Sequence, residues 1–180
     1  MLKKILLLSG WMTDLKLYRK YDDLTIQVSK LSSESEKIDY IIGLSLGALI
    51  ALREWNKSGK LILINPPLPK RNIFVWLGKW IKFILSEGLF LERQKFTKNP
   101  FRFITEIIKC VKLLSVDFSK VLDNIPEDKL VVIKGKNDNY FCDQKAVEFM
   151  RSKNITVIEV ENAGHNWCEE IEKTVNKLIN

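Results

Sequence analysis

The residues Asp39–Lys57, which read DYIIGLSLGALIALREWNK, decide how this chain folds. The apolar residues Tyr40–Ile42 are typical of a short buried strand. From Leu46 onward, apolar residues recur close to the 3.6-residue period of a helix. The stretch therefore predicts a strand, a tight turn over residues 43–47 and then a helix.

Ser45 lies at the centre of that turn, with Gly43 two residues before it and Gly47 two residues after it. The spacing G-x-S-x-G between a strand and a helix is the pattern of a nucleophile elbow. Such a turn strains the serine backbone and leaves no room for side chains at the glycine positions. We expect an exposed Ser45 hydroxyl beside the N–H of Leu46, where an oxyanion would be stabilised.

The rest of the chain alternates strands with helices. Sequence patterns predict a helix over Lys145–Lys153 and another from about Asn166. Further strands are predicted at Lys3–Leu8, Leu24–Val28, Leu61–Ile64, Leu130–Ile133 and Ile155–Val160. This alternation predicts an α/β fold with a mainly parallel, six-stranded sheet and helices on both faces. Sites in such sheets lie on the loops at the carboxyl ends of the strands.

Two candidate partners of Ser45 lie on those loops. Asp138 follows one predicted strand, and His165, the only histidine, follows the last one. We expect His165 to act as the base for Ser45 and Asp138 to orient His165. Plainer interpretations stay open, in which Asp138 is a turn residue and His165 caps the terminal helix. Asp143 is a rival acid, although it suits the N-cap of the following helix.

With these residues in the order serine, acid, histidine, nearly the whole chain resembles an α/β-hydrolase. The loop Ser9-Gly10-Trp11 and the Gly-x-Ser-Leu-Gly elbow are similar to those of pimeloyl-ACP methyl ester esterases of biotin synthesis. The resemblance implies an oxyanion hole formed by the backbone N–H groups of Trp11 and Leu46. It also implies a serine carboxylesterase that requires no cofactor and no metal.

A long insertion separates the strand ending near Asn65 from the one starting at Leu130. We expect a single domain over residues 1–180, with residues 68–125 as a helical insertion before the penultimate strand. Residues 71–86 and 100–114 carry apolar and aromatic side chains at helical spacing. The resemblance implies that this insertion forms a lid over the nucleophile and lines a tunnel for an acyl chain.

The positive charge of the chain is concentrated in this insertion. Residues 70–112 hold ten basic and three acidic residues, a net charge of +7 that equals the charge of the whole chain. An acyl carrier protein is acidic, so we expect one to dock there and to contact Arg102, Lys109 and Lys112. An anionic membrane surface and a merely solvated basic face are the alternatives. No nucleic-acid recognition motif accompanies the charge.

The cysteine and histidine content indicates the redox compartment of the protein and whether it binds zinc. Three widely spaced cysteines without a C-x-x-C pair are typical of reduced thiols, so we expect a cytoplasmic protein. A single histidine speaks against a zinc site. The apolar run near the N-terminus is short and is interpreted as a buried strand, not as a secretory signal.

The expected reaction is hydrolysis of an acyl ester, most specifically the methyl ester of pimeloyl-ACP. A thioesterase acting on acyl-ACP or acyl-CoA would use the same three residues, and a general small-ester hydrolase would not need the carrier. A non-catalytic binding protein on a hydrolase scaffold is the alternative outside enzymology.

Overall fold

The computed structural model describes residues 3–10, 38–55, 59–86 and 108–180. Within these ranges five strands form one parallel sheet in the order β1-β2-β3-β4-β5. The strands are β1 (Ile5–Leu8), β2 (Tyr40–Leu44), β3 (Lys60–Ile64), β4 (Leu130–Gly135) and β5 (Thr156–Val160). The sixth strand predicted from the sequence, Leu24–Val28, lies outside the described residues, so the described sheet has five strands.

The central strands are apolar on both faces, as expected of a parallel sheet covered on both sides. All four residues 61–64 of β3 are fully buried. In the register of the sheet, Ile62 lies opposite Ile42 of β2 and Val131 of β4. Because all strands run in the same direction, their carboxyl ends meet at one edge of the sheet.

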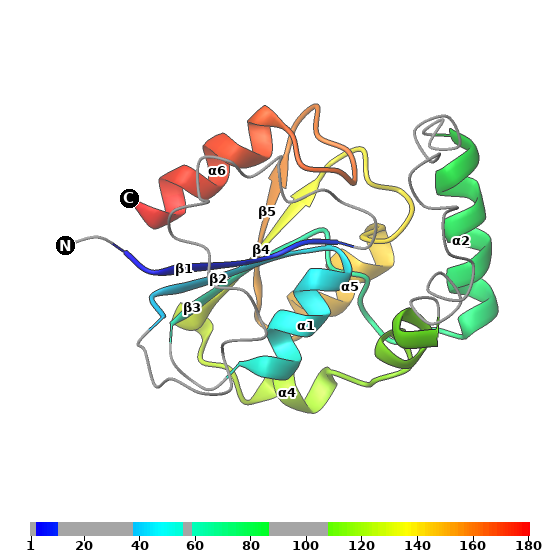
Figure 1. The fold of residues 1–180 in the computed structure, drawn as a ribbon, viewed down its shortest axis with the longest axis horizontal. Coiled ribbons are helices and arrows are strands. Elements are labelled where there is room, and N and C mark those ends of the chain that lie inside the picture. The colour runs from blue at the N-terminus through cyan, green and yellow to red at the C-terminus, as the bar shows by residue number, and fades with distance from the viewer. Residues whose placement is uncertain (1–2, 11–37, 56–58, 87–107) are drawn as a thin grey trace, which may run out of the picture.

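Helices cover both faces of the sheet, as the sequence predicts (Figure 1). On one face lie α1 (Leu46–Glu54), α4 (Ser119–Asp123) and α5 (Gln144–Ser152), which share an apolar cluster with the sheet. Each of these helices lies along the chain between two strands that are adjacent in the sheet, and right-handed crossovers between neighbours in sequential order place these three helices on the same side. The C-terminal helix α6 (Glu169–Ile179) connects no strands and covers the opposite face.

The start of α6 differs from the prediction of about Asn166. The helix begins at Glu169, with Cys168 at its N-cap and Glu169 and Glu170 in its first turn. Acidic residues are favourable there because the helix dipole is positive at that end. His165 precedes this N-cap by three residues, so the alternative in which it caps the helix does not hold.

Between β3 and β4 the chain forms α2 (Ile73–Ser86), and residues 108–114 are also helical. Figure 1 shows α2 (green) standing beside the sheet and not on either face. Trp76 and Phe83 are buried on its inner side. The side chains exposed on its outer side are large and apolar: Phe74, Leu77, Ile81 and Leu85. None of the described helices is long and apolar enough to cross a membrane.

A cluster of charges attaches α2 to the body of the protein. Arg71, just before α2, and Lys79 within it both contact the carboxylate of Asp143, at 2.5 Å and 2.8 Å. Asp143 is also the N-cap of α5 and accepts a hydrogen bond from the N–H of Ala146. Asp143 is therefore an N-cap, as its sequence context predicts. Arg71 and Lys79, two basic residues of the insertion, thus form ion pairs within the described part of the fold.

Partial burial alone would raise the pKa of Asp143. The hydrogen bonds from Arg71 and Lys79 outweigh that effect and hold the pKa well below its ordinary value. A carboxylate with a lowered pKa stabilises the folded state at every pH above its unfolded-state pKa. The stabilisation is lost as the pH falls toward the folded-state value. The attachment of α2 is thus fully present at neutral pH.

We predict that Asp143→Ala destabilises the protein more than Asp143→Asn. Asparagine still caps α5 but does not pair with Arg71 and Lys79, a loss of about 2 kcal/mol. Alanine removes the cap as well, which costs about 1 kcal/mol more. Urea unfolding at pH 7 measures both losses, and the difference between wild type and Asp143→Asn should shrink in strong acid. Equal stability of the two variants would contradict the cap.

Candidate active site

Ser45 occupies the turn between β2 and α1 in a strained conformation. Its φ is 53° and its ψ is −120°, a combination that is rare for a residue with a side chain. The N–H of Ser45 donates a hydrogen bond to the carbonyl of Ile64 at 2.8 Å, so the neighbouring strand β3 supports the turn. The turn has the geometry expected of the elbow pattern.

The two glycines of the motif are required by close packing. A Cβ on Gly43 would lie 2.6 Å from the Cα of Ala48 in α1. A Cβ on Gly47 would collide with the backbone carbonyls of Leu8 and Ser9 at the end of β1. The glycines therefore let the strand, the helix and the loop after β1 approach the serine closely.

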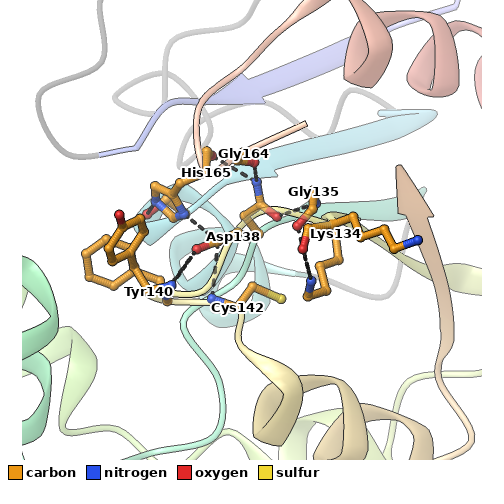
Figure 2. Close-up of polar contacts among 11 residues, drawn as sticks. Lys134, Gly135, Asp138, Tyr140, Cys142, Gly164 and His165 are labelled. Carbon is orange, nitrogen blue, oxygen red and sulfur yellow. Dashed lines mark hydrogen bonds and ion pairs between the residues drawn. The ribbon is translucent and has the colours of Figure 1, made fainter. Parts of the chain in front are cut away.

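Ser45, His165 and Asp138 form one hydrogen-bonded chain. The Nε2 atom of His165 lies 2.9 Å from Oγ of Ser45, and its Nδ1 atom lies 2.7 Å from Oδ2 of Asp138. Figure 2 shows the histidine ring beside Asp138, with dashed lines joining the acid to its partners. The carboxylate needs a proton on Nδ1, which leaves Nε2 of a neutral ring free to accept the hydroxyl proton of the serine.

Asp138 is fully buried, and the hydrogen bonds that its carboxylate accepts favour the ionised form. Its Oδ1 accepts from the N–H groups of Tyr140 and Phe141 at 3.0 Å and 3.1 Å, and its Oδ2 accepts from Cys142 N–H at 3.2 Å. Burial alone would raise the pKa of Asp138. The hydrogen bond and charge of His165, with the backbone donors, outweigh burial and lower the pKa below its ordinary value. Asp138 is thus both a turn residue and the partner of His165.

Aromatic rings enclose the histidine. The ring of Phe141 lies 4.6 Å from that of His165, centroid to centroid, and the ring of Phe83 from α2 lies 5.2 Å away at a steep angle. Trp76 stacks on Phe141 at 6.2 Å. These contacts leave His165 only 8% exposed. The inner face of α2 therefore borders the hydrogen-bonded chain directly.

Sequence reasoning named the α2 aromatics but missed two residues of this site, Phe141 and Asn65. Phe141 follows the acid by three positions, and its contact with His165 depends on how the loop turns. Asn65 is fully buried at the end of β3, where it bonds to the histidine loop. A polar residue at the carboxyl end of an apolar strand was the available signal for Asn65.

Of the other predicted site residues, Leu46, Lys109 and Lys112 lie within the described residues. Leu46 is the first residue of α1, where N–H groups have no acceptor inside the helix. Lys109 and Lys112 lie exposed in the helical residues 108–114. Trp11 and Arg102 lie outside the described residues.

No group of three or more histidine, cysteine, aspartate or glutamate residues able to hold a metal occurs in the described parts of the chain. Cys110, Cys142 and Cys168 form no disulfide. Burial raises the pKa of Cys142 above its ordinary value, which keeps this thiol protonated. The site is built from the serine, the histidine and the acid, with aromatic surroundings.

Comparisons with known proteins match this architecture at the level of structure. Protein-family models give no match, and neither do curated proteins. A thermophilic esterase from Thermogutta terrifontis is 16% identical with a TM-score of 0.60, over 99% of this chain and 88% of that one. An α/β-hydrolase enzyme from the sediment metagenome of the Mar Chica lagoon, Morocco, is 18% identical with a TM-score of 0.58, over 98% and 88%.

A third match, from work on carboxylesterases of Nitrososphaera gargenis, is 14% identical with a TM-score of 0.52, over 91% of this chain and 69% of that one. At such identities the likeness is one of fold. The chain has the α/β-hydrolase fold. In this fold Ser45, Asp138 and His165 follow β2, β4 and β5 at the carboxyl edge of the sheet.

We predict that the proton between His165 and Asp138 gives a resolved downfield resonance in the ¹H NMR spectrum. Because the protein has a single histidine, the imidazole assignment is unambiguous. Asp138→Ala should remove the resonance, since no carboxylate then holds the Nδ1 proton. Asp143→Asn is the control, because that carboxylate bonds Arg71 and Lys79 instead. A resonance that persists in Asp138→Ala would contradict the contact.

Proposed function

We propose that this protein is a serine carboxylesterase that hydrolyses an acyl ester. The observation that carries the proposal is the hydrogen-bonded chain from Asp138 through His165 to Ser45. A serine hydroxyl is a weak nucleophile, and a neutral imidazole in hydrogen-bond contact is the base that activates it. The esterases and hydrolases with the same fold support this class of reaction.

In the proposed reaction His165 Nε2 takes the proton of Ser45 as Oγ attacks the ester carbonyl. The ionised Asp138 stabilises the imidazolium that forms and holds its ring in place. His165 then returns the proton to the leaving alcohol, which leaves an acyl group on Ser45. Water activated by His165 releases the acid and restores the serine.

The oxyanion of the tetrahedral intermediate needs donors beside Ser45. We assign this role to the backbone N–H of Leu46, at the start of α1, together with that of Trp11. Each such donor lowers the barrier by about 3 kcal/mol in comparable enzymes. The backbone of the elbow is fixed before the substrate binds. In this proposal the N–H of Leu46 is therefore already oriented toward the oxyanion position, and no donor has to reorient during the reaction.

The acyl chain of the substrate is proposed to lie along the inner face of α2. Phe83 and Phe141 contact each other and both contact His165, so they form an apolar wall beside the imidazole. In this proposal residues 68–125 act as a lid, with α2 attached through Asp143. A hydrophobic acyl group favours such a surface, whereas a sugar or peptide would leave polar groups without partners.

The specific substrate we propose is the methyl ester of pimeloyl-ACP. The acyl carrier protein would dock on the basic insertion, where Lys82, Lys109 and Lys112 are exposed. This docking also explains why the positive charge of the chain is gathered in residues 70–112. A thioesterase would share the triad and the carrier, but would release the carrier thiol and not methanol.

We predict that Ser45→Ala abolishes turnover of a short acyl methyl ester, with a loss of at least ~10³-fold in kcat. Wild-type protein should react with a fluorophosphonate probe at Ser45, whose hydroxyl lies in hydrogen-bond contact with His165. Labelling is read by mass spectrometry and turnover by acid release. A wild-type protein that neither labels nor turns over esters would instead be a binding protein on this scaffold.

The carrier hypothesis is tested with one pimeloyl methyl ester presented free and on acyl carrier protein. We predict a strong preference for the carrier-bound form, with methanol as the product. Equal turnover of the free ester would indicate a general small-ester hydrolase, and release of the carrier thiol would indicate a thioesterase.

The docking surface is tested by charge reversal. The double variant Lys109→Glu/Lys112→Glu should raise KM for the carrier-bound ester by about tenfold at low salt, equivalent to ~1.4 kcal/mol, and leave the free ester unaffected. The matched control Lys173→Glu/Lys177→Glu reverses two charges on α6, on the far face of the sheet. An identical KM change in both double variants would contradict a specific docking site.

A further inference from the structure

Asn65 occupies a central place behind the three candidate catalytic residues. It directly follows β3, the strand that lies between the strand leading to Ser45 and the strand leading to Asp138. Its side chain is fully buried. Its φ of 47° lies in the left-handed region, which asparagine, aspartate and glycine tolerate and other residues avoid.

The carboxamide of Asn65 joins two loops that are far apart in sequence. Its Nδ2 atom donates to the carbonyls of Gly164 and His165, each at 2.9 Å. Its Oδ1 atom accepts from the N–H of Gly135 at 2.8 Å. Gly135 ends β4 just before the acid loop, and Gly164 and His165 form the histidine loop. Figure 2 shows Gly135, Gly164 and His165 gathered close to Asp138.

The backbone around Asn65 extends the same connection. The N–H of Asn65 donates to the carbonyl of Ile133 at 2.9 Å, and the carbonyl of Ile64 accepts from Ser45 N–H at 2.8 Å. The segment Ile64–Asn65 therefore bonds to the serine turn, the end of β4 and the histidine loop. A Cβ on Gly135 would collide with the carbonyl of Gly164, so the two loops pack backbone against backbone beside this carboxamide.

Only a carboxamide satisfies this arrangement. The site offers two carbonyls that need donors and one N–H that needs an acceptor, and a single orientation of the amide pairs all three. Aspartate would supply the acceptor but would face two carbonyl oxygens without a proton. An aliphatic residue would leave these three backbone groups without this partner, and the cost is largest for the buried carbonyl of His165 and N–H of Gly135.

We propose that Asn65 is a positioning residue that holds the histidine loop against the acid loop, so that His165 stays within reach of both Asp138 and Ser45. It binds the carbonyl of His165 itself, so a change at Asn65 acts directly on the backbone that carries the imidazole. Asn65 does not touch the reacting atoms and is not a catalytic residue in this account. The expected effect on kcat rests on the proposed hydrolase function. The hydrogen bonds of Asn65 hold the two loops together whether or not the protein is a hydrolase.

The test uses the full chain with Asn65→Asp and Asn65→Gly, both compatible with the left-handed backbone. Asn65→Asp keeps the acceptor and removes the two donors, whereas Asn65→Gly removes the whole side chain. We expect kcat for the ester to fall about 10²-fold in both, the effect of displacing a catalytic group by about 1 Å, with KM unchanged. The downfield ¹H resonance of the single histidine should shift or vanish.

The matched control is Asn154→Gly with Asn154→Asp. Asn154 has a similar left-handed φ of 57° but is exposed and precedes β5, at the opposite edge of the sheet from the site. These variants report the effect of changing an asparagine in this backbone conformation, and we expect kcat and the histidine resonance to stay at wild-type values. Folded Asn65 variants with unchanged kcat and an unchanged resonance would overturn the proposal.

Two measurements keep the outcomes separate. If the wild-type protein has no esterase activity, the proposed function fails, while the histidine resonance in the Asn65 variants still decides the positioning role. If neither Asn65 variant folds, hydrogen exchange of the Asn65 carboxamide in the wild-type protein tests the positioning role. Both Nδ2 protons of Asn65 should exchange slowly with solvent because the side chain is fully buried and both protons are bonded to backbone carbonyls. Rapid exchange of these protons would overturn the proposal.

Discussion

The candidate site depends on the parallel register of β2, β3, β4 and β5. Because these strands run in one direction and lie side by side in sequential order, the residues that follow them come together at one edge. Ser45, Asn65, Asp138 and His165 each follow a different strand of this set. The apolar interior of the sheet keeps the strands in register. The packing of the strands therefore also fixes the positions of the polar residues at their ends.

A second constraint is the burial of polar groups at that edge. Asn65 and Asp138 are fully buried and His165 nearly so, and such groups are stable only when every donor and acceptor has a partner. The structure meets this requirement with backbone N–H groups for Asp138 and with backbone carbonyls for Asn65. The same bonds that make burial tolerable also restrict the motion of the imidazole. Stability of the loops and geometry of the site are therefore coupled.

The basic residues of the insertion differ in their surroundings, and the composition of the segment does not reveal this difference. Arg71 and Lys79 pair with Asp143 and attach α2 to the body, while Lys82, Lys109 and Lys112 remain exposed. On α2 itself, Phe83 faces the histidine and Phe74 faces outward. The helix α2 therefore presents apolar side chains both toward the site and away from it.

The sequence by itself determined the alternation of strands and helices, the elbow around Ser45 and the N-cap at Asp143, because each of these rests on neighbouring residues or a short period. It also placed Asp138 and His165 on loops at the carboxyl edge, since their position after apolar runs is a local property. The terminal helix begins three residues later than predicted, because Cys168 and the acidic first turn, not Asn166, start it. Only the tertiary structure decided which basic residues are engaged, that Phe141 and Phe83 flank His165, and that Asn65 bridges two loops. These contacts join residues that lie far apart in the chain, and no local pattern encodes which of them meet.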